Sequence, residues 1–303
     1  MSNSLLRFVS GDRLVRGEIV SLDSAWLEVA GRHRLPDCVR DRLGELCAAS
    51  LLLAASLKFE GALVLQIHGD GPVALFVVEC DAQGTFRATV KMREGQAAPE
   101  DAPLVELVNA HGRGRFVVTL DPRGTSSNRQ PYQGIVPFEG DSVAGVLENY
   151  MQRSEQVPTR LWLAADGRRA VGLLLQRLPS EGGTAAPAHT DDDGWDRMNH
   201  LAATLTRAEL LELPAQQVLH RLFWQEPLRA LESRNCRFAC RCTREKVAGM
   251  LRLLGRDEVE SIVRERGDVD VACEYCNLSY RFDPVDCTSL FLPAAPGASE
   301  LTH

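Results

Sequence analysis

Four cysteines near the end of the chain have the spacing of a metal site. Cys240 and Cys242 are separated by one residue, Cys273 and Cys276 by two, and about thirty residues lie between the pairs. Two such pairs can present four thiolates to one ion and complete the tetrahedral shell that zinc prefers. We therefore expect these cysteines to bind one Zn²⁺ per chain. Four reduced thiols packed in a core, or two disulfides, remain open as alternatives.

The residues around the first pair bear on the reactivity of its sulfurs. A zinc ribbon uses Cys-x-x-Cys turns whose backbone amides hydrogen-bond to the sulfurs, whereas a Cys-x-Cys pair leaves less room for such a turn. Positive charge favours thiolate over thiol. Four basic residues lie near the pair: Arg237, Arg241, Arg244 and Lys246. They favour nucleophilic sulfurs, although they are equally typical of a solvated surface.

The segment that carries the cysteines is small. About 65 residues follow residue 239, which is near the size at which a hydrophobic core alone no longer stabilises a domain. A structural zinc contributes about 10–16 kcal/mol to such a module, so we expect metal removal to unfold it. Oxidants attack thiolates, and a disulfide sulfur no longer binds zinc. Oxidation, zinc release and unfolding would then form one coupled event.

Composition and charge argue against several classes of protein. The chain has 303 residues, 45% of them hydrophobic and 25% charged, as is typical of soluble globular proteins. Its net charge of −7 argues against a nucleic-acid partner. Residues 1–15 lack the apolar segment of a signal peptide, and no apolar run reaches the roughly 18 residues of a membrane span. We therefore expect a cytoplasmic protein, where paired cysteines more often bind metals or react than form structural disulfides.

Residues 1–178 predict an α+β domain with a largely antiparallel sheet and packed helices. Apolar residues at helical spacing over 38–59 predict a long helix with one buried face. Short apolar runs separated by glycine-containing turns predict antiparallel strands, at 15–20, 62–68, 73–80, 85–91, 115–120, 132–137, 160–164 and 170–176. A helix over 143–153 has Asp141 or Ser142 as its N-cap. We interpret Cys38, Cys47 and Cys80 as packed side chains.

Residues 179–235 differ in composition from the domain before them. The part up to residue 194 is rich in Gly, Ala, Pro and Asp and is typical of a flexible insert. Residues 195–232 are amphipathic and proline-interrupted, which predicts short helices, one of them capped by Thr206 together with Glu209. This apolar surface must be buried on the large domain or on a partner, either permanently or until it is exposed on demand.

Residues 236–303 form the expected zinc-binding redox-switch domain. Thr243 can cap a helix that ends at Gly255, and a second helix follows over 257–264. The second cysteine pair lies in the turn of a predicted hairpin over 269–282. Cys236 and Cys287 lie outside the two pairs, and we interpret them as adventitious thiols rather than spare ligands.

Several motifs resemble those of a known family. They are Cys240-x-Cys242, Cys273-x-x-Cys276, Tyr132-Gln133-Gly134, Glu139-Gly140-Asp141, Arg153-Ser154-Glu155-Gln156 and Pro158-Thr159-Arg160. With these motifs spread over nearly its whole length, the chain resembles the redox-regulated 33-kDa heat-shock chaperones of bacteria and some organelles. It departs from the pattern in the length of its insert at 180–194 and in the additional thiols of Cys236 and Cys287.

The resemblance implies a cytoplasmic, ATP-independent holdase that is inactive while zinc is bound to the four thiolates. By the same resemblance, oxidation joins Cys240 to Cys242 and Cys273 to Cys276, releases zinc and destabilises the helical linker. The family then binds unfolding client proteins under oxidative and heat stress, usually as a homodimer.

Functions of other classes also fit parts of the sequence. A thiol–disulfide oxidoreductase would carry Cys-x-x-Cys at a helix N-terminus, whereas Cys273 and Cys276 are expected in a hairpin. A constitutive zinc-ribbon adaptor is compatible with the cysteines. The serines and acids of residues 132–178 have no convergent histidine partner visible in the sequence, and no ATP-binding motif is present, so we expect no enzymatic activity.

Overall fold

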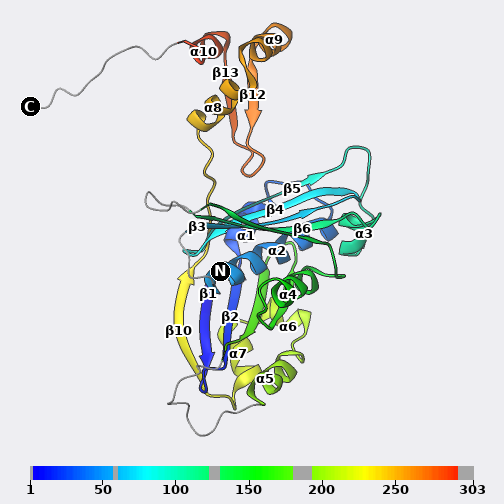
Figure 1. The fold of residues 1–303 in the computed structure, drawn as a ribbon, viewed down its shortest axis with the longest axis vertical. Coiled ribbons are helices and arrows are strands. Elements are labelled where there is room, and N and C mark those ends of the chain that lie inside the picture. The colour runs from blue at the N-terminus through cyan, green and yellow to red at the C-terminus, as the bar shows by residue number, and fades with distance from the viewer. Residues whose placement is uncertain (1–2, 57–60, 123–129, 180–192, 293–303) are drawn as a thin grey trace, which may run out of the picture. The chain divides into compact units, whose positions relative to one another are not determined.

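The computed structural model describes residues 3–56, 61–122, 130–179 and 193–292. They belong to two compact units, Met1–Ala239 and Cys240–His303 (Figure 1). The first unit is a mixed α+β domain with largely antiparallel strands, as the sequence predicts, but the strands form two sheets rather than the single sheet expected. Among the described helices, none has the length and apolar character needed to cross a membrane.

The first unit contains a five-stranded antiparallel sheet, sheet A. Its strands, in spatial order, are β10 (Leu228–Asn235), β1 (Ser4–Ser10), β2 (Val15–Leu22), β9 (Ala170–Arg177) and β8 (Thr159–Ala165). Both faces of its centre are buried, because Val15 and Ile19 of β2 lie on one face while Val20 and Leu22 lie on the other. A sheet buried on both faces needs a covering layer on each side.

The second sheet of this unit, sheet B, has six strands. In spatial order they are β11 (Arg237–Phe238), β5 (Thr85–Met92), β4 (Val73–Asp81), β3 (Gly61–His68), β6 (Arg115–Pro122) and β7 (Tyr132–Pro137). Neighbouring strands are antiparallel except for the short parallel pair of β11 and β5. The predicted meander of β3, β4 and β5 is confirmed.

Helix α2 (Asp37–Ser56) lies between the two sheets and is buried on all sides from Leu43 to Ala55 (Figure 1). The prediction of one buried face is therefore wrong for this helix. A helix packed between two sheets must be apolar around its whole circumference, and the run Leu51-Leu52-Leu53-Ala54-Ala55 shows this character. The other helices of this part of the unit are α1 (Ser24–Ala30), α3 (Leu104–Val108) and α4 (Val143–Arg153).

Helix α4 confirms a local capping prediction. The Ser142 hydroxyl accepts a hydrogen bond from the Gly145 N–H at 3.1 Å, which satisfies one of the free amides of the first turn. The apolar face of the helix, Val143, Val146, Leu147 and Tyr150, is buried in the core that α2 shares with both sheets.

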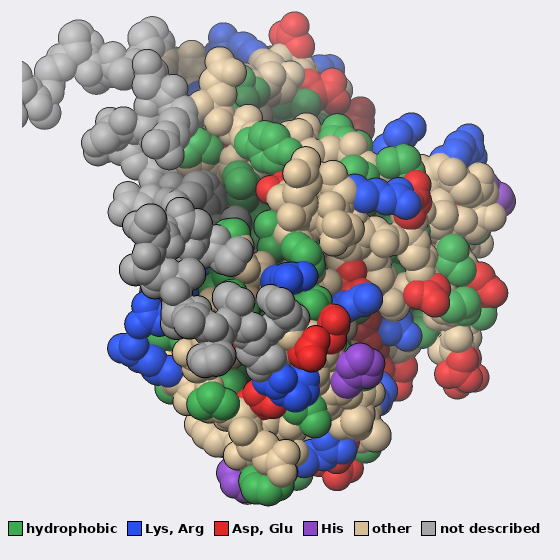
Figure 2. Space-filling model, turned by 60° about the horizontal axis from the view of Figure 1, so that its bottom comes forward, with side chains coloured by type: hydrophobic (Ala, Val, Ile, Leu, Met, Phe, Trp, Pro, Cys, Tyr) green, Lys and Arg blue, Asp and Glu red, His purple; other side chains and the backbone are tan. Residues whose placement is uncertain are grey.

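Three short helices cover the outer face of sheet A: α5 (Gly194–Ala202), α6 (Arg207–Glu212) and α7 (Ala215–Phe223). The predicted capping box is present, because Thr206 and Glu209 exchange hydrogen bonds at the start of α6. The predicted insert at 180–194 falls almost entirely outside the described residues. Figure 2 shows the end of the unit that carries α5 and α7, where hydrophobic side chains are interspersed with charged ones.

The chain after Pro227 corrects one prediction. Residues 228–232 are expected to be helical, yet Leu228–Asn235 forms strand β10, which pairs with β1 from Ser10 to Ser4. Leu, Arg, Ala and Glu favour a helix in isolation, but an available strand edge overrides that preference. The sequence does not reveal β1, so it could not reveal the partner that β10 requires. Cys236 and β11 follow, and both belong to the first unit.

The second unit is built around a small core. Its elements are α8 (Arg244–Leu254), α9 (Arg256–Arg266), the hairpin strands β12 (Val269–Ala272) and β13 (Ser279–Phe282), and α10 (Pro284–Ser289). The buried hydrophobic residues in its described part are Ala248, Leu251, Val259, Val269, Phe282 and Cys287. Thr243 caps α8 as predicted, and Gly255, with φ of 101°, separates α8 from α9. Helix α10 is not predicted by the sequence analysis, although Asp283 and Asp286 form a capping box there.

Candidate metal centre

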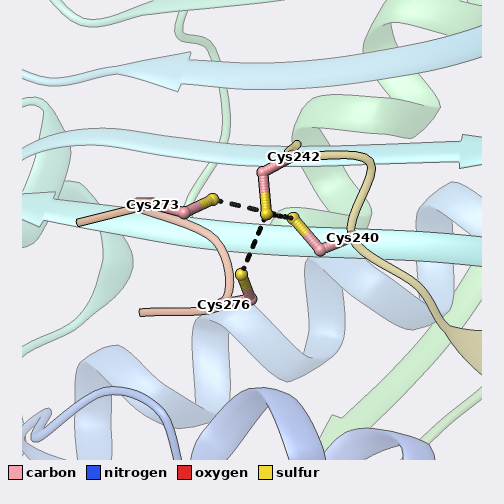
Figure 3. Close-up of side chains that lie close together, drawn as sticks. All are labelled: Cys240, Cys242, Cys273 and Cys276. Atoms are coloured by element: carbon pink, nitrogen blue, oxygen red, sulfur yellow. Dashed lines mark hydrogen bonds between the residues drawn. The ribbon is translucent and has the colours of Figure 1, made fainter. Parts of the chain in front are cut away.

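The four paired cysteines lie together in the second unit (Figure 3). Cys240 and Cys242 come from the extended segment before α8, and Cys273 and Cys276 from the turn between β12 and β13. All four sulfurs lie within 4.8 Å of one another. The Sγ–Sγ distances are 3.4 Å for Cys240–Cys242, 3.6 Å for Cys240–Cys273 and 3.3 Å for Cys242–Cys276. The cluster predicted from spacing is therefore present.

Local backbone structure explains why the second pair converges. The Cys273 N–H donates to the Leu278 carbonyl at 3.0 Å, and the Asn277 N–H donates to the Cys273 carbonyl at 2.8 Å. Asn277 adopts a positive φ of 56°, a conformation that asparagine tolerates better than most residues. These bonds fold the turn so that both of its cysteines point toward the first pair.

The first pair is held by the start of α8. The Thr243 hydroxyl accepts a hydrogen bond from the Lys246 N–H at 3.3 Å, so the helix begins directly after Cys242. The Lys246 ammonium donates to the carbonyl of Arg241, the residue between the two cysteines, at 2.7 Å. The cap and this bond together restrict the backbone of the Cys-x-Cys segment.

The cluster has the dimensions of a tetrahedral thiolate site. Zinc–sulfur bonds of about 2.3 Å place the sulfurs of a tetrahedron about 3.8 Å apart, close to the distances here. A disulfide would bring two sulfurs to about 2.05 Å, and all nine cysteines are free thiols in the structure. Four sulfur donors with no carboxylate or imidazole among them favour zinc over hard cations such as magnesium or calcium. The residues therefore fit the ion predicted from the sequence.

The thiols of the cluster differ in how readily they lose a proton. Burial opposes ionisation of Cys242, but hydrogen bonds from Tyr280 and from the other thiols outweigh it and lower its pKa to about 7. Burial and the neighbouring sulfurs raise the pKa of Cys276 to about 12 and also raise that of Cys240. One thiolate thus forms readily, and each further one is disfavoured by the negative charge already present. A divalent cation would remove this penalty.

The basic residues near the first pair make other contacts than the sequence analysis expects. Arg244 lies over the Phe282 ring, 4.2 Å from its centroid, and pairs with Asp286 at 2.7 Å. Arg237 belongs to β11 of the first unit, where its Nε lies 3.5 Å from the Thr85 hydroxyl. Hydrogen bonds from Tyr280 and from thiols, rather than cationic side chains, lead the effects that favour the Cys242 thiolate.

Tyr280 is the functional residue that the sequence analysis misses. Its hydroxyl donates to the Cys242 sulfur at 3.2 Å, and this bond raises the Tyr280 pKa to about 12. Groups that hydrogen-bond to metal ligands fix ligand orientation and basicity. The signal in the sequence is the alternation of Tyr280 and Phe282 in β13, which places both side chains on the face that packs against the core.

The remaining five cysteines lie outside the cluster. Cys47 and Cys80 are buried in the core of the first unit, as predicted, while Cys38 is half-buried. Burial raises the pKa of Cys236 to about 12, and this residue packs in that same core. Cys287 is buried in the core of the second unit. Cys236 and Cys287 are therefore not ligands in this arrangement, in agreement with their interpretation from sequence.

An apolar face of sheet A, covered by α5–α7, is a second candidate functional feature. We call it the covered face, and its sheet residues are Phe8, Val15, Ile19, Ala164, Val171, Leu173 and Leu175. From the helices, Met198, Leu210, Leu222 and Phe223 are buried against it. The ring centroids of Phe8 and Phe223 are 6.2 Å apart. The amphipathic surface predicted for residues 195–232 is thus buried on the large domain rather than left open.

Comparison with known proteins identifies the family of the chain. The family model described as Hsp33 protein matches residues 3–283. The chain belongs to the Hsp33 family. The fold is similar to that of the crystal structure of the 33 kDa chaperonin from Thermotoga maritima, with a TM-score of 0.77 over 96% of this chain and 98% of that chain. At 23% identity it shows a shared fold.

Two relatives extend the Hsp33 assignment at the level of sequence. The 33 kDa chaperonin of Methylobacillus flagellatus is 45% identical over 292 residues, which cover 96% of this chain and 95% of that protein. The 33 kDa chaperonin of Chromobacterium violaceum is 46% identical over 289 residues, covering 95% of this chain and 94% of that protein. The sequence resemblance to this family is confirmed.

Proposed function

We propose that this chain is a redox-regulated, ATP-independent holdase of the cytoplasm, inactive when reduced and bound to one zinc ion. One observation carries most of the proposal: four thiols converge within 4.8 Å in a unit whose described core has only six buried hydrophobic residues. A module with so small a core depends on a cross-link. The name of its relatives, 33 kDa chaperonin, supports the chaperone part.

We infer that Cys240, Cys242, Cys273 and Cys276 hold the zinc. Bound zinc would neutralise the thiolates and join the segment before α8 to the β12–β13 turn, contributing about 10–16 kcal/mol to the folded unit. Tyr280 orients Cys242 through its hydrogen bond. The thiolates stay accessible to an oxidant, because all four cysteines are only half-buried.

Oxidation removes this cross-link. Peroxide oxidises one thiolate to a sulfenic acid, and a second thiol displaces water to form the disulfide, so two electrons leave each cysteine pair. We propose the pairs Cys240–Cys242 and Cys273–Cys276 from the family resemblance. The sulfur distances alone do not select them, since Cys242–Cys276, at 3.3 Å, is as close as Cys240–Cys242, at 3.4 Å.

The order of elements along the chain suggests how unfolding reaches the covered face. Only Ala239 separates Cys240 from β11, and β11 follows β10, which follows α7. Most residues of β10 are exposed, so the apolar contribution to its attachment is small. We propose that loss of order in the second unit releases this segment, uncovers the apolar face of sheet A, and allows binding of unfolding clients. Homodimerisation is proposed to accompany this change.

The test measures zinc content and suppression of client aggregation before and after peroxide treatment at mildly elevated temperature. We expect one zinc per chain to be lost as holdase activity appears. Retained zinc with unchanged activity would contradict the proposal, as would normal activation of the Cys240→Ser, Cys242→Ser variant. Redox-independent partner binding would instead indicate an adaptor, and turnover in insulin reduction would indicate an oxidoreductase. Sedimentation of the reduced and oxidised forms tests dimerisation.

Tryptic mapping tests the disulfide pairing, because Arg241 lies between Cys240 and Cys242 while Cys273 and Cys276 share the tryptic peptide 267–281. The proposed pairing joins peptide 238–241 to peptide 242–244 and leaves an internal disulfide in 267–281. Either crossed pairing would instead link both short peptides to 267–281.

A further inference from the structure

The two sheets of the first unit end in four edge strands that differ in their protection. An unpaired edge can pair with another chain, and proteins counter this with short strands, charges, bulges or covering groups. Edge strand β10 carries Arg229, Glu232 and Arg234 and has a register shift against β1. Edge strand β11 has only two residues. Both are protected in ordinary ways.

Edge strand β8 is blocked by side chains. The backbone N–H of Arg177 donates to the Pro158 carbonyl, and the Asp166 N–H donates to the Arg169 carbonyl. The backbone groups of even-numbered residues of β8 therefore bond to β9, and those of odd-numbered residues point away from the sheet. The outward N–H of Leu161 donates to Glu148 at 2.7 Å. The outward carbonyl of Ala165 accepts from Arg207. A strand approaching β8 would have to displace both side chains.

Edge strand β7 has neither kind of protection along its centre. The Phe138 N–H donates to the carbonyl of Gly114, the residue before β6, so the backbone groups of even-numbered residues of β7 bond to β6. The backbone N–H and C=O groups of Gln133 and Ile135 therefore point away from the sheet. No described residue bonds to these outward groups. The strand Tyr-Gln-Gly-Ile-Val-Pro contains no charge, and Tyr132 and Ile135 are 51% and 56% exposed. Only Pro137, which has no N–H, limits pairing at its end.

The inner face of β7 is partly covered, because Gly134 and Val136 are half-buried. A Cβ on Gly134 would lie 3.1 Å from the Tyr150 hydroxyl oxygen, so glycine allows α4 to pack closely beneath the strand. The Tyr150 ring is edge-on to Phe116 at 5.8 Å, and its hydroxyl donates to Glu155 at 2.8 Å. Pairing with β6 also holds β7 extended before a partner binds, which lowers the entropy cost of binding.

We propose that β7 is a strand-addition site for an extended apolar segment of an unfolding client. Backbone pairing tolerates many sequences, as a site for diverse unfolded chains must. The exposed side chain of Ile135 lies beside Val117 of β6 on the same face of the sheet. An apolar or β-branched residue of the client would fit on the other side of Ile135. A second copy of this chain fits less well, because a six-residue edge buries far less than the roughly 1,200–2,000 Å² of a stable interface. This proposal rests on the holdase function and adds a backbone-pairing contact for the client to the apolar contact proposed on the covered face.

The experiment uses the full-length oxidised protein and reduced, carboxymethylated α-lactalbumin, a permanently unfolded probe. Amide hydrogen exchange is followed in residues 130–138, and affinity is measured for Ile135→Pro and Ile135→Lys. Proline removes an outward N–H without breaking the ladder to β6, and lysine leaves the backbone intact but places a charge on the edge. Leu27→Lys is the matched control, because Leu27 is an exposed leucine, 42% accessible, on α1 of the same unit.

We expect the probe to slow exchange in 130–138. Ile135→Pro should weaken binding roughly tenfold, because it removes one to two hydrogen bonds. Ile135→Lys should also weaken binding, because it places a charge on the edge. Leu27→Lys should bind like the wild type, and circular dichroism should show all variants folded. Unchanged exchange with the probe, or wild-type affinity of both Ile135 variants, would overturn the proposal. Protection that appears without probe and rises with protein concentration would also overturn it, in favour of pairing between copies. An oxidised wild type that binds no probe would instead refute the holdase function itself.

Discussion

Phe223 offers the sharpest test of the idea that α5–α7 control access to the covered face. Its side chain is 2% exposed, and its ring packs against Phe8 of sheet A. Replacing a buried phenylalanine by alanine costs about 3–5 kcal/mol, and each 1.4 kcal/mol changes an equilibrium constant about tenfold. Phe223→Ala should therefore increase the population of undocked helices at least about 100-fold while leaving the cysteine cluster intact.

The assay compares reduced, zinc-loaded wild type and variant. Amide exchange over 195–223 should accelerate in Phe223→Ala, and the reduced variant should suppress aggregation of a model client without peroxide. Zinc content should stay at the wild-type value. Trp224→Ala is the matched control, because the adjacent Trp224 is 67% exposed and its removal should change neither exchange nor activity.

Two results would refute this reasoning at different steps. Unchanged exchange in Phe223→Ala would show that the Phe8–Phe223 contact does not hold the helices on the sheet. Accelerated exchange without any client binding would show that the covered face is not where clients bind, even though the helices had been released.

Three further predictions concern other parts of the molecule. Tyr280→Phe removes the hydrogen bond to Cys242 and should lower zinc affinity about tenfold in competition with a chelator. Complete chelation should abolish exchange protection in α8 and α9 while leaving α2 protected, since the four cysteines proposed to hold zinc all lie in the second unit. Burial raises the pKa of Glu18 to about 7 against the attraction of Arg16 and Arg7. The folded state then keeps a proton that the unfolded chain has released, so stability should fall by up to about 3 kcal/mol as pH rises from about 4.5 to 7. Urea unfolding at both ends of that range should show this fall, and Glu18→Gln should flatten it.

Local signals in the sequence were sufficient for much of the fold. Caps at Ser142, Thr206 and Thr243 depend on bonds within one helical turn, and all three are confirmed. The meander of β3–β5 follows from short turns between neighbouring strands. By contrast, β1 and β10 are far apart in sequence and define each other only by pairing. A helical prediction for residues 228–232 therefore failed where the partner was unknown.

The candidate site shows the same division. The spacing within each cysteine pair is a local property and identified all four members of the cluster. Tyr280 was missed because α8 and α9 lie between it and Cys242 in the sequence, so that only folding brings the two residues together. The sequence left open whether the basic residues beside the first pair act on its sulfurs or lie on a solvated surface, and packing directs Arg244 to Phe282 and Asp286.

By itself, the sequence identified the four cysteines of the cluster, the α+β class and the amphipathic character of the segment after the insert, because residue type and short-range spacing are enough for each. Only the tertiary structure decided that the two cysteine pairs meet, that α2 is buried between two sheets, that α5–α7 cover sheet A, and that β7 keeps a free edge. These features depend on contacts between residues distant in sequence, whose ordering costs chain entropy that only cooperative burial of the whole unit offsets.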